Sequence, residues 1–532
     1  MTTPSRDPLD PLANERTPLI VPSHNGTKTA DSQTSPQPSR PYKRVLTLLC
    51  IVLVLVQCGD ELGQSPNTRI AEAIICYRHY EAADPTKLLI GRAAVGPGAI
   101  GGVSEISCKV GAVQSQLSTL RGYQGFLDGM PSLLLALPFG WAADKYGRKP
   151  FLVLGVLSFV LRVIWKQLVF WFWQSLDIRW SWASALHGLM AGSSPVVSAL
   201  FFVIVSDIVP ENERSKIFLR LGGVNLISAV SMPLFSAWLM EFTPWIPSFA
   251  GTFLTACAMP VALAMPETLG WSSSETREPM TGLEQEQEQE REQSSAATSQ
   301  RTSPQSPTSS PAATLRHALA FLRADYRIPL LIASFLFHLA VIETPPLQLQ
   351  YISTRYDLTI ANATKLLTLR SIANLTPLFV LLPLLSKFLT QTWHLSGQRS
   401  DLYLSRLSMI TWAIGWTLFG LAPTLLPATA AMGITALGSG SFFLIRAFLT
   451  PLVPEQNVAK LYSVISVVDT LGYMLGIPML AALFNKGLAI GGYGVGLPFY
   501  VLGGMCTVVA VVLCGIGLRK GEEGTDGEDG GE

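Results

Sequence analysis

Long apolar runs separated by polar stretches organise this chain from residue 45 to residue 518. Most of these runs are close to the ~20 residues that an α-helix needs to cross a bilayer. We therefore predict an all-α membrane protein whose twelve transmembrane helices fall into two groups of six. The predicted spans are 45–64, 122–143, 151–172, 183–205, 217–240, 246–265, 329–350, 366–388, 404–421, 426–449, 461–484 and 498–518.

Three polar segments flank or divide the spans. Residues 1–42 are rich in Pro, Ser, Thr and Asn and begin without an apolar run, which predicts a disordered cytosolic tail and no cleavable signal peptide. Residues 268–327 hold too few apolar residues for a core and are predicted to be a disordered cytosolic linker. Residues 519–532 form an acidic cytosolic tail, which leaves an N-terminal bundle at 43–267 and a C-terminal bundle at 328–518.

The N-terminal tail contains one candidate sorting signal. Glu15, Leu19 and Ile20 have the spacing of an acidic dileucine sorting signal. A chance match in a segment of low complexity explains the same residues equally well. The plasma membrane is therefore the expected location, with the vacuolar membrane as the alternative.

Residues 67–118 are of mixed polarity and are predicted to form the first outer loop, although helix one could continue through Ile75. Cys76 and Cys108 bracket this loop. Outside the cytosol a disulfide between them is permitted. The distance between the two cysteines does not follow from the sequence, so a bridge and two free thiols both remain open.

The composition supports a membrane protein without catalytic chemistry. Hydrophobic residues make up 49% of the 532 residues and charged residues only 14%, against about 25% charged in soluble domains. The net charge is +1 without a basic patch, so no nucleic-acid partner is expected. The seven cysteines lack metal-ligand spacing, and we find no nucleophile elbow or phosphate-binding glycine loop. We expect no metal, no cofactor and no enzymatic activity.

A charged turn, GWAADKYGRKP, lies at residues 140–150 between the second and third spans. Asp144, Lys145, Arg148 and Lys149 cannot lie in hydrocarbon, and Gly147 allows the backbone to turn sharply. The excess of positive charge places the turn on the cytoplasmic side.

This turn resembles the signature loop between helices two and three of the major facilitator superfamily, a large class of secondary transporters. The matching residues are Gly140, Asp144, Lys145, Gly147, Arg148 and Lys149. The resemblance implies the major facilitator fold, in which two six-helix bundles related by an axis along the membrane normal enclose a cavity and operate by alternating access. Among members, the layout resembles fungal facilitators and is distantly similar to the proton-coupled folate transporter branch.

A repeat between the halves agrees with that fold. The segments VPENERSKIF at 209–218 and VPEQNVAKLY at 453–462 both follow the fourth span of their half and precede the fifth. At the same spacing, Asn225 corresponds to Asp469.

The resemblance also implies a gate, because the equivalent turn clamps the inner ends of the bundles together in the outward-open state. We expect Arg148 to pair with Asp207 at the end of span four, and Asp144 to face the amino end of span eleven near Lys460. The alternative is that these charges only fix the orientation of the chain in the membrane.

Ionisable residues inside the spans are costly and therefore usually face a cavity or a partner. A rise of about 1.5 Å per residue puts Asp60, Asp128 and Arg162 at a similar depth, so Arg162 is expected to pair with Asp60 or Asp128. A structural ion pair and a proton-coupled pair both remain open. Lys166 lies nearer the outer face and is expected to snorkel.

In the resembling fold, spans one, four, seven and ten line the substrate path. Glu343 precedes Pro345 and Pro346, where the helix must break and release backbone carbonyls beside a carboxylate. His338 could exchange protons or could be a packing residue. The candidate substrate and proton path comprises Gln57, Asp60, Glu61, Asp128, Arg162, His338, Glu343, Arg446 and Asp469, with His187 also on span four.

The resemblance favours proton-coupled efflux of an organic small molecule, such as a secondary metabolite, by a monomer whose partners are the lipid bilayer, the substrate and protons. Span four lacks the arginine of proton-coupled exporters, and span five carries Ser231, Met232 and Pro233 instead of their glycine-proline signature. Proton-coupled uptake of a nutrient or a folate-like anion is the first alternative. A non-transporting membrane sensor or scaffold with the same fold is the second.

Overall fold

The computed structural model describes residues 42–209, 211–268, 322 and 325–517. The predicted sorting signal and acidic tail, and nearly all of the predicted N-terminal tail and linker, lie outside the described residues.

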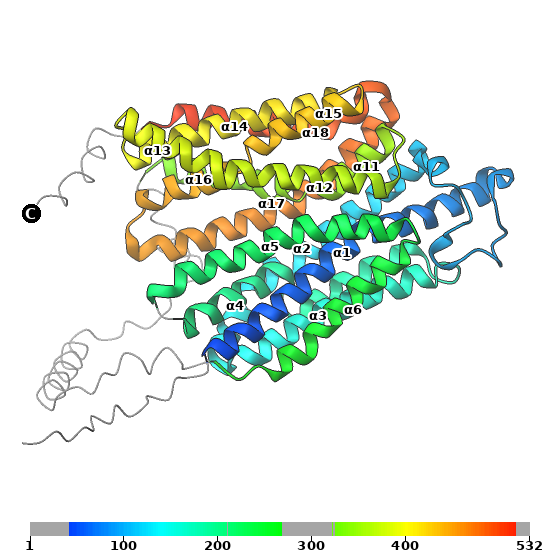
Figure 1. Ribbon diagram of the computed structural model, residues 1–532, viewed down its shortest axis with the longest axis horizontal. Coiled ribbons are helices and arrows are strands. Elements are labelled where there is room, and N and C mark those ends of the chain that lie inside the picture. The colour runs from blue at the N-terminus through cyan, green and yellow to red at the C-terminus, as the bar shows by residue number, and fades with distance from the viewer. Residues whose placement is uncertain (1–41, 210, 269–321, 323–324, 518–532) are drawn as a thin grey trace, which may run out of the picture. The chain divides into compact units, whose positions relative to one another are not determined.

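The N-terminal half of the described chain contains six long helices (Figure 1). The fourth is interrupted, because a 3₁₀ segment at Ile178–Met190 precedes α4. The helices are α1 (Tyr42–Ala83), α2 (Gly111–Tyr146), α3 (Arg148–Trp171), α4 (Ser193–Ile208), α5 (Glu211–Met240) and α6 (Trp245–Ala264).

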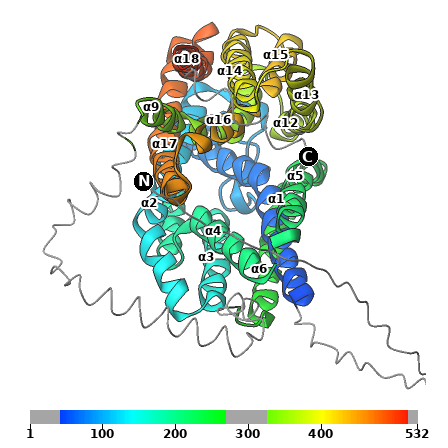
Figure 2. The ribbon, with the colours of Figure 1, turned by 90° about the vertical axis from the view of Figure 1, so that its left-hand side faces the viewer.

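The C-terminal half repeats this arrangement with more breaks, so that three of its spans consist of two or more helices. Figure 2 shows α14, α15 and α18 grouped away from α3, α4 and α6. The helices are α9 (Arg327–Ser334), α10 (His338–Ile342), α11 (Pro345–Arg355), α12 (Ile360–Thr376), α13 (Leu382–Thr392), α14 (Gly397–Leu421), α15 (Leu425–Leu437), α16 (Ser441–Leu449), α17 (Glu455–Ile490) and α18 (Leu497–Gly515).

The number of apolar helices agrees with the predicted fold. The described residues contain nine helices that are long and apolar enough to cross a membrane, or up to eleven if each of two bent pairs is one span. The helix α14 is less apolar because it carries Arg399, Asp401 and Arg406 near its start, and counting it gives twelve. The described part has helices and no β-strand, so the all-α prediction is confirmed.

The first span is longer than predicted. Helix α1 continues past the expected end at residue 64 and past Ile75 to Ala83, with Pro66 inside it. The extension is stable because Ile70, Ile74 and Tyr77 are buried in a hydrophobic cluster with the outer loop. The outer loop therefore begins near residue 84, and its predicted start at 67 is wrong.

Helices α1 and α6 cross at a pair of glycines. A Cβ atom on Gly251 would lie 2.6 Å from the carbonyl oxygen of Gly59, and one on Gly59 would lie 2.7 Å from the carbonyl oxygen of Gly251. Small residues at such positions let two backbones approach closely inside a membrane.

We expect Gly251→Leu to destabilise the protein by at least about 1–3 kcal/mol, because the added side chain forces the two helices apart. Thermal unfolding of the detergent-purified protein would measure this loss. A Cβ on Gly222 would meet nothing within 4 Å, so Gly222→Leu is the matched control. An unchanged melting temperature for Gly251→Leu would contradict the close crossing.

The two halves pack against each other along the outer part of α2 and α17. A Cβ on any of three glycines of α2 would lie within 2.8 Å of an α17 side-chain atom, in the pairs Gly122–Ala481, Gly125–Ile477 and Gly129–Met474. Further out, Asn485 Nδ2 donates to Thr119 Oγ1 at 2.8 Å. At the inner end of α2, Trp141 and Tyr146 are exposed. The contacts between α2 and α17 close the outer side of the molecule.

Candidate functional site

A cavity of about 530 Å³ lies between the two halves. Its walls come from α1, α2, α3, α6, α10, α11 and α17 and from the start of α4. The charged groups of its lining are three carboxylates and three cations, and most of them come from the N-terminal half. They are Asp60, Asp128, Glu343, Arg121, Arg162 and Lys166.

One ion pair dominates the α2–α3 wall. Arg162 Nη2 lies 2.5 Å from Asp128 Oδ2, and Gln124 Nε2 donates to Asp128 Oδ1 at 2.8 Å. Of the two partners expected for Arg162, the structure therefore selects Asp128. Asp60 lines the same cavity, and the described residues offer it no hydrogen bond or ion pair within contact distance.

Glu343 occupies the break in span seven. Helix α10 ends at Ile342, α11 begins at Pro345, and the two parts of the span are bent by 48°. Thr344 stabilises the break, since its hydroxyl donates to the carbonyl of Val341 at 2.8 Å. The Glu343 carboxylate is exposed to the cavity, has no hydrogen-bond partner among the described residues, and experiences the negative charge of Asp60. It is therefore free to bind a proton or a cationic group.

Three of the candidate path residues form a separate cluster in the C-terminal half. Asp469 accepts from His338 Nδ1 at 2.8 Å and from Arg446 Nη2 at 2.9 Å. The His338 ring also packs on Phe442, with ring centroids 4.4 Å apart. These three residues are not among those that line the 530 Å³ cavity. Their geometry favours the packing interpretation of His338 in this state.

The remaining candidates on spans one and four differ in whether they reach the cavity. Gln57 lines the cavity, whereas Glu61 does not and instead accepts from Gln57 Nε2 at 3.4 Å. His187 lies in the 3₁₀ segment before α4, where its carbonyl accepts from Ser158 at 2.7 Å. Neither Glu61 nor His187 contributes to the described cavity lining.

The charged turn lies between α2 and α3. Gly147 has φ 110°, a conformation that residues with a Cβ rarely adopt, and a Cβ there would lie 2.5 Å from a Glu267 carboxylate oxygen. Glu267 accepts from the backbone N–H of Arg148 at 2.7 Å and of Lys149 at 3.2 Å. A carboxylate at the amino end of α3 is favourable because of the helix dipole. Glu267 is not among the residues expected from the sequence, although a lone carboxylate directly after span six was a visible signal.

Arg148 connects the turn to span four. Its Nε lies 3.2 Å from Asp207 Oδ2, and its guanidinium also pairs with Asp144 one turn earlier. Asp144 is therefore bound to Arg148 rather than to the amino end of α17, where Lys460 donates to Asn457. Because the outer side is closed, the structure does not test a clamp that forms in the outward-open state. Lys145 Nζ lies 4.9 Å from the Trp141 ring centroid, and Gly140 has open space around its Cα.

Lys166 is placed differently from the expectation. It lines the cavity instead of snorkelling to the outer face. The reason is helical geometry: Lys166 follows Arg162 by four residues on α3, so both project from one face. Arg121 was also missed; it reaches the other half, where its Nη1 donates to the carbonyl of Pro346 at 2.8 Å.

Sequence relationships agree with this fold and cavity. The family model for the Major Facilitator Superfamily matches residues 113–392, which is more than half of the chain. The chain belongs to the Major Facilitator Superfamily.

Two curated relatives match over most of their length. The chain is 29% identical to the MFS efflux pump atnC of Emericella nidulans, over 92% of this chain and 91% of the relative. It is 25% identical to the efflux pump ustT of Aspergillus flavus, over 88% of this chain and 88% of the relative.

Solved structures share the fold at low sequence identity. The nucleoside transporter NupG superposes with a TM-score of 0.54 at 11% identity, covering 88% of this chain and 98% of that chain. A bacterial homologue of the iron transporter ferroportin in an inward-facing state superposes with a TM-score of 0.55 at 14% identity, covering 89% and 98%. These similarities concern the fold alone.

Proposed function

We propose that this membrane transporter exports an organic small molecule, such as a fungal secondary metabolite, by proton-coupled alternating access. The observation that carries this proposal is the 530 Å³ cavity between the halves, closed at the outer side and lined by a free carboxylate at the break in span seven. The names of the two curated relatives, both efflux pumps, support the direction.

Glu343 is the residue that we assign to proton coupling. An ionised group inside a membrane costs roughly 2.5–3.5 kcal/mol, so a proton on Glu343 lowers the cost of closing the halves around it. A proton that binds from the outside and is released to the cytosol would return the transporter to the state that binds the next substrate molecule. Asp60 faces the same cavity and adds a second site of negative charge.

Reconstitution tests the proposed function. The purified full-length protein would be placed in liposomes with an imposed pH gradient and screened against a panel of fungal metabolites. We expect movement of at least one metabolite against its concentration gradient and opposite to the proton flow. Substrate movement in the same direction as protons would instead support uptake of a nutrient or folate-like anion. A chain that binds metabolites without moving them would support the sensor or scaffold.

Lys166 is the cavity cation that we assign to the substrate. Arg162 is paired with Asp128, whereas Lys166 has no carboxylate within ion-pair distance among the described residues. The geometry favours a substrate that carries an anionic group.

We expect Lys166→Met to raise the KM for the transported metabolite about tenfold, because a charge-assisted hydrogen bond is worth about 1.5–3 kcal/mol. Transport kinetics in liposomes would measure the change. Lys166→Arg should retain most of the affinity, and Lys486→Met, at an exposed position on α17, should have no effect. An unchanged KM in Lys166→Met would remove Lys166 from the binding site.

We further propose that the plasma membrane is the site of action and that the chain acts as a monomer.

A further inference from the structure

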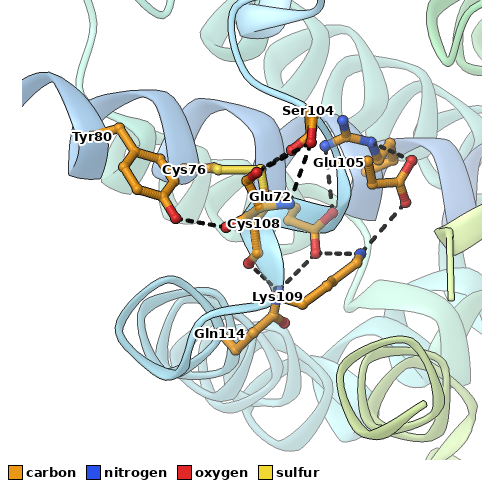
Figure 3. The surroundings of a disulfide bond; sticks show 10 residues. Glu72, Cys76, Tyr80, Ser104, Glu105, Cys108, Lys109 and Gln114 are labelled. Carbon is orange, nitrogen blue, oxygen red and sulfur yellow. Dashed lines mark hydrogen bonds and ion pairs between the residues drawn. A yellow bond between two sulfur atoms is a disulfide. The ribbon is translucent and has the colours of Figure 1, made fainter. Parts of the chain in front are cut away.

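The outer loop between α1 and α2 is bound covalently to the outer end of α1. A disulfide joins Cys76 of α1 to Cys108 of the short helix η3 (Ile106–Lys109), with the two Cα atoms 5.3 Å apart (Figure 3). Both cysteines are fully buried. Tyr80, one turn further along α1, donates its hydroxyl to the carbonyl of Ser107 at 2.8 Å. The position of η3 is therefore determined by α1.

A charged cluster lies directly beneath the disulfide. Glu72 is 0% exposed and accepts from Lys109 Nζ at 2.7 Å, from Gln114 Nε2 at 2.7 Å and from Arg69 Nη1 at 3.4 Å (Figure 3). Burying a carboxylate is costly unless such partners surround it. Glu105 also belongs to the cluster. The two acids, Glu72 and Glu105, therefore balance the charge of the two bases, Arg69 and Lys109.

Glu105 extends this cluster to the other half of the protein. Its Oε2 lies 3.0 Å from Arg69 Nε and its Oε1 lies 3.4 Å from Lys109 Nζ. The same Oε1 accepts from the backbone N–H of Ile360 at 2.6 Å. Ile360 is the first residue of α12, where the helix dipole favours an anion. Thr359 caps a different N–H, that of Asn362, so the two acceptors do not compete.

A second bridge starts from the same cluster. Gln350 of α11 donates its Nε2 to the backbone carbonyl of Gln114 at 2.7 Å, and the same Nε2 lies 3.0 Å from Gln114 Oε1. The cluster thus contacts α11 and α12, both in the C-terminal half. Opening of the outer side requires these contacts to break.

We propose that Glu105 is a latch that holds the outer gate closed, and that the Cys76–Cys108 disulfide positions it. Glu105 immediately precedes η3, so releasing the disulfide frees the segment that carries the carboxylate. The outward-open population then rises when either the carboxylate or the disulfide is removed. This inference concerns the gate and holds whether the substrate is exported or imported.

A reporter cysteine in the cavity tests the latch without a known substrate. Gln64→Cys lies on the cavity lining and would be introduced after the free cysteines Cys50, Cys58, Cys257, Cys506 and Cys514 are replaced by serine. A membrane-impermeant maleimide applied from the outside labels this position only when the outer gate opens. The same reagent applied from the cytosolic side reports the inward-facing state.

We expect Glu105→Gln to raise the rate of labelling from the outside about tenfold, because a hydrogen bond to a charged group is lost. Labelling from the cytosolic side should fall at the same time, which distinguishes a shift between states from local unfolding. Glu81→Gln is the matched control, because Glu81 pairs with Arg92 within the N-terminal half. Its labelling rates should stay within twofold of the parent.

The disulfide is tested on folded protein by pretreatment with an impermeant phosphine reductant, which is removed before labelling. Because reduction leaves two further thiols, at Cys76 and Cys108, that also react with the maleimide, labelling is read at position 64 alone by mass spectrometry of its peptide. Reduction should raise outside labelling in the parent but add little in Glu105→Gln, because both changes release the same contact. Equal labelling of the parent and a monodisperse Glu105→Gln variant would overturn the latch. Additive effects of reduction and Glu105→Gln would overturn the positioning role of the disulfide.

Discussion

Glu343→Gln is expected to lower gradient-driven transport by on the order of 100-fold. The neutral amide removes the free-energy difference of roughly 2.5–3.5 kcal/mol between the ionised and protonated side chain, which corresponds to about two powers of ten. Glutamine has the size of a protonated glutamate but cannot release the proton. The cavity would therefore still bind substrate, while the pH gradient would no longer drive the cycle.

The measurement compares two assays in the same liposomes. Uptake driven by a pH gradient should be lost in Glu343→Gln, whereas exchange of labelled for unlabelled substrate without a gradient should persist. Glu61→Gln provides the control, because Glu61 lies on α1 outside the described cavity lining. Equal loss of exchange and of driven transport would mean that Glu343 binds the substrate instead of coupling the proton.

Glu72→Gln is expected to destabilise the folded protein by about 3–5 kcal/mol, because it leaves the ammonium of Lys109 buried with one fewer carboxylate. The Lys109 side chain is only 2% exposed and cannot reach water to compensate. Expression level and thermal unfolding in detergent would measure the loss.

A second substitution separates charge from packing. Lys109→Met combined with Glu72→Gln removes both charges and should recover part of the lost stability, although Glu105 then loses a partner as well. Glu81→Gln at the same outer end should change the melting temperature little, because surface ion pairs contribute about 0–1 kcal/mol. A Glu72→Gln protein as stable as the parent would show that the cluster is not essential for folding.

The fold was largely predictable because hydrophobic length is a strong signal in membranes. The signature turn from Gly140 to Lys149 pointed to the superfamily to which the chain belongs. Local chemistry also placed the break at Glu343 correctly, since Pro345 and Pro346 cannot continue a helix.

The details that were wrong or missed depend on contacts between distant segments. The extension of α1 to Ala83 is stabilised by a loop whose packing has no periodic signature. The choice of Asp128 over Asp60 as the partner of Arg162 depends on helix rotation, which depth alone does not determine. Glu105 and Ile360 are far apart in sequence, and no local pattern predicts their contact.

The break in span seven divides that span into two helical parts whose relative angle can change. The inner part, α10, packs on α17, whereas the outer part, α11, is hydrogen-bonded to α2 through Gln350 and Pro346. Glu343 lies at the bend between these two parts, about 10 Å along a helix from Gln350. Protonation of Glu343 and release of the outer contacts therefore act on the same helix, α11. The angle between α10 and α11 would couple proton binding to opening of the outer side.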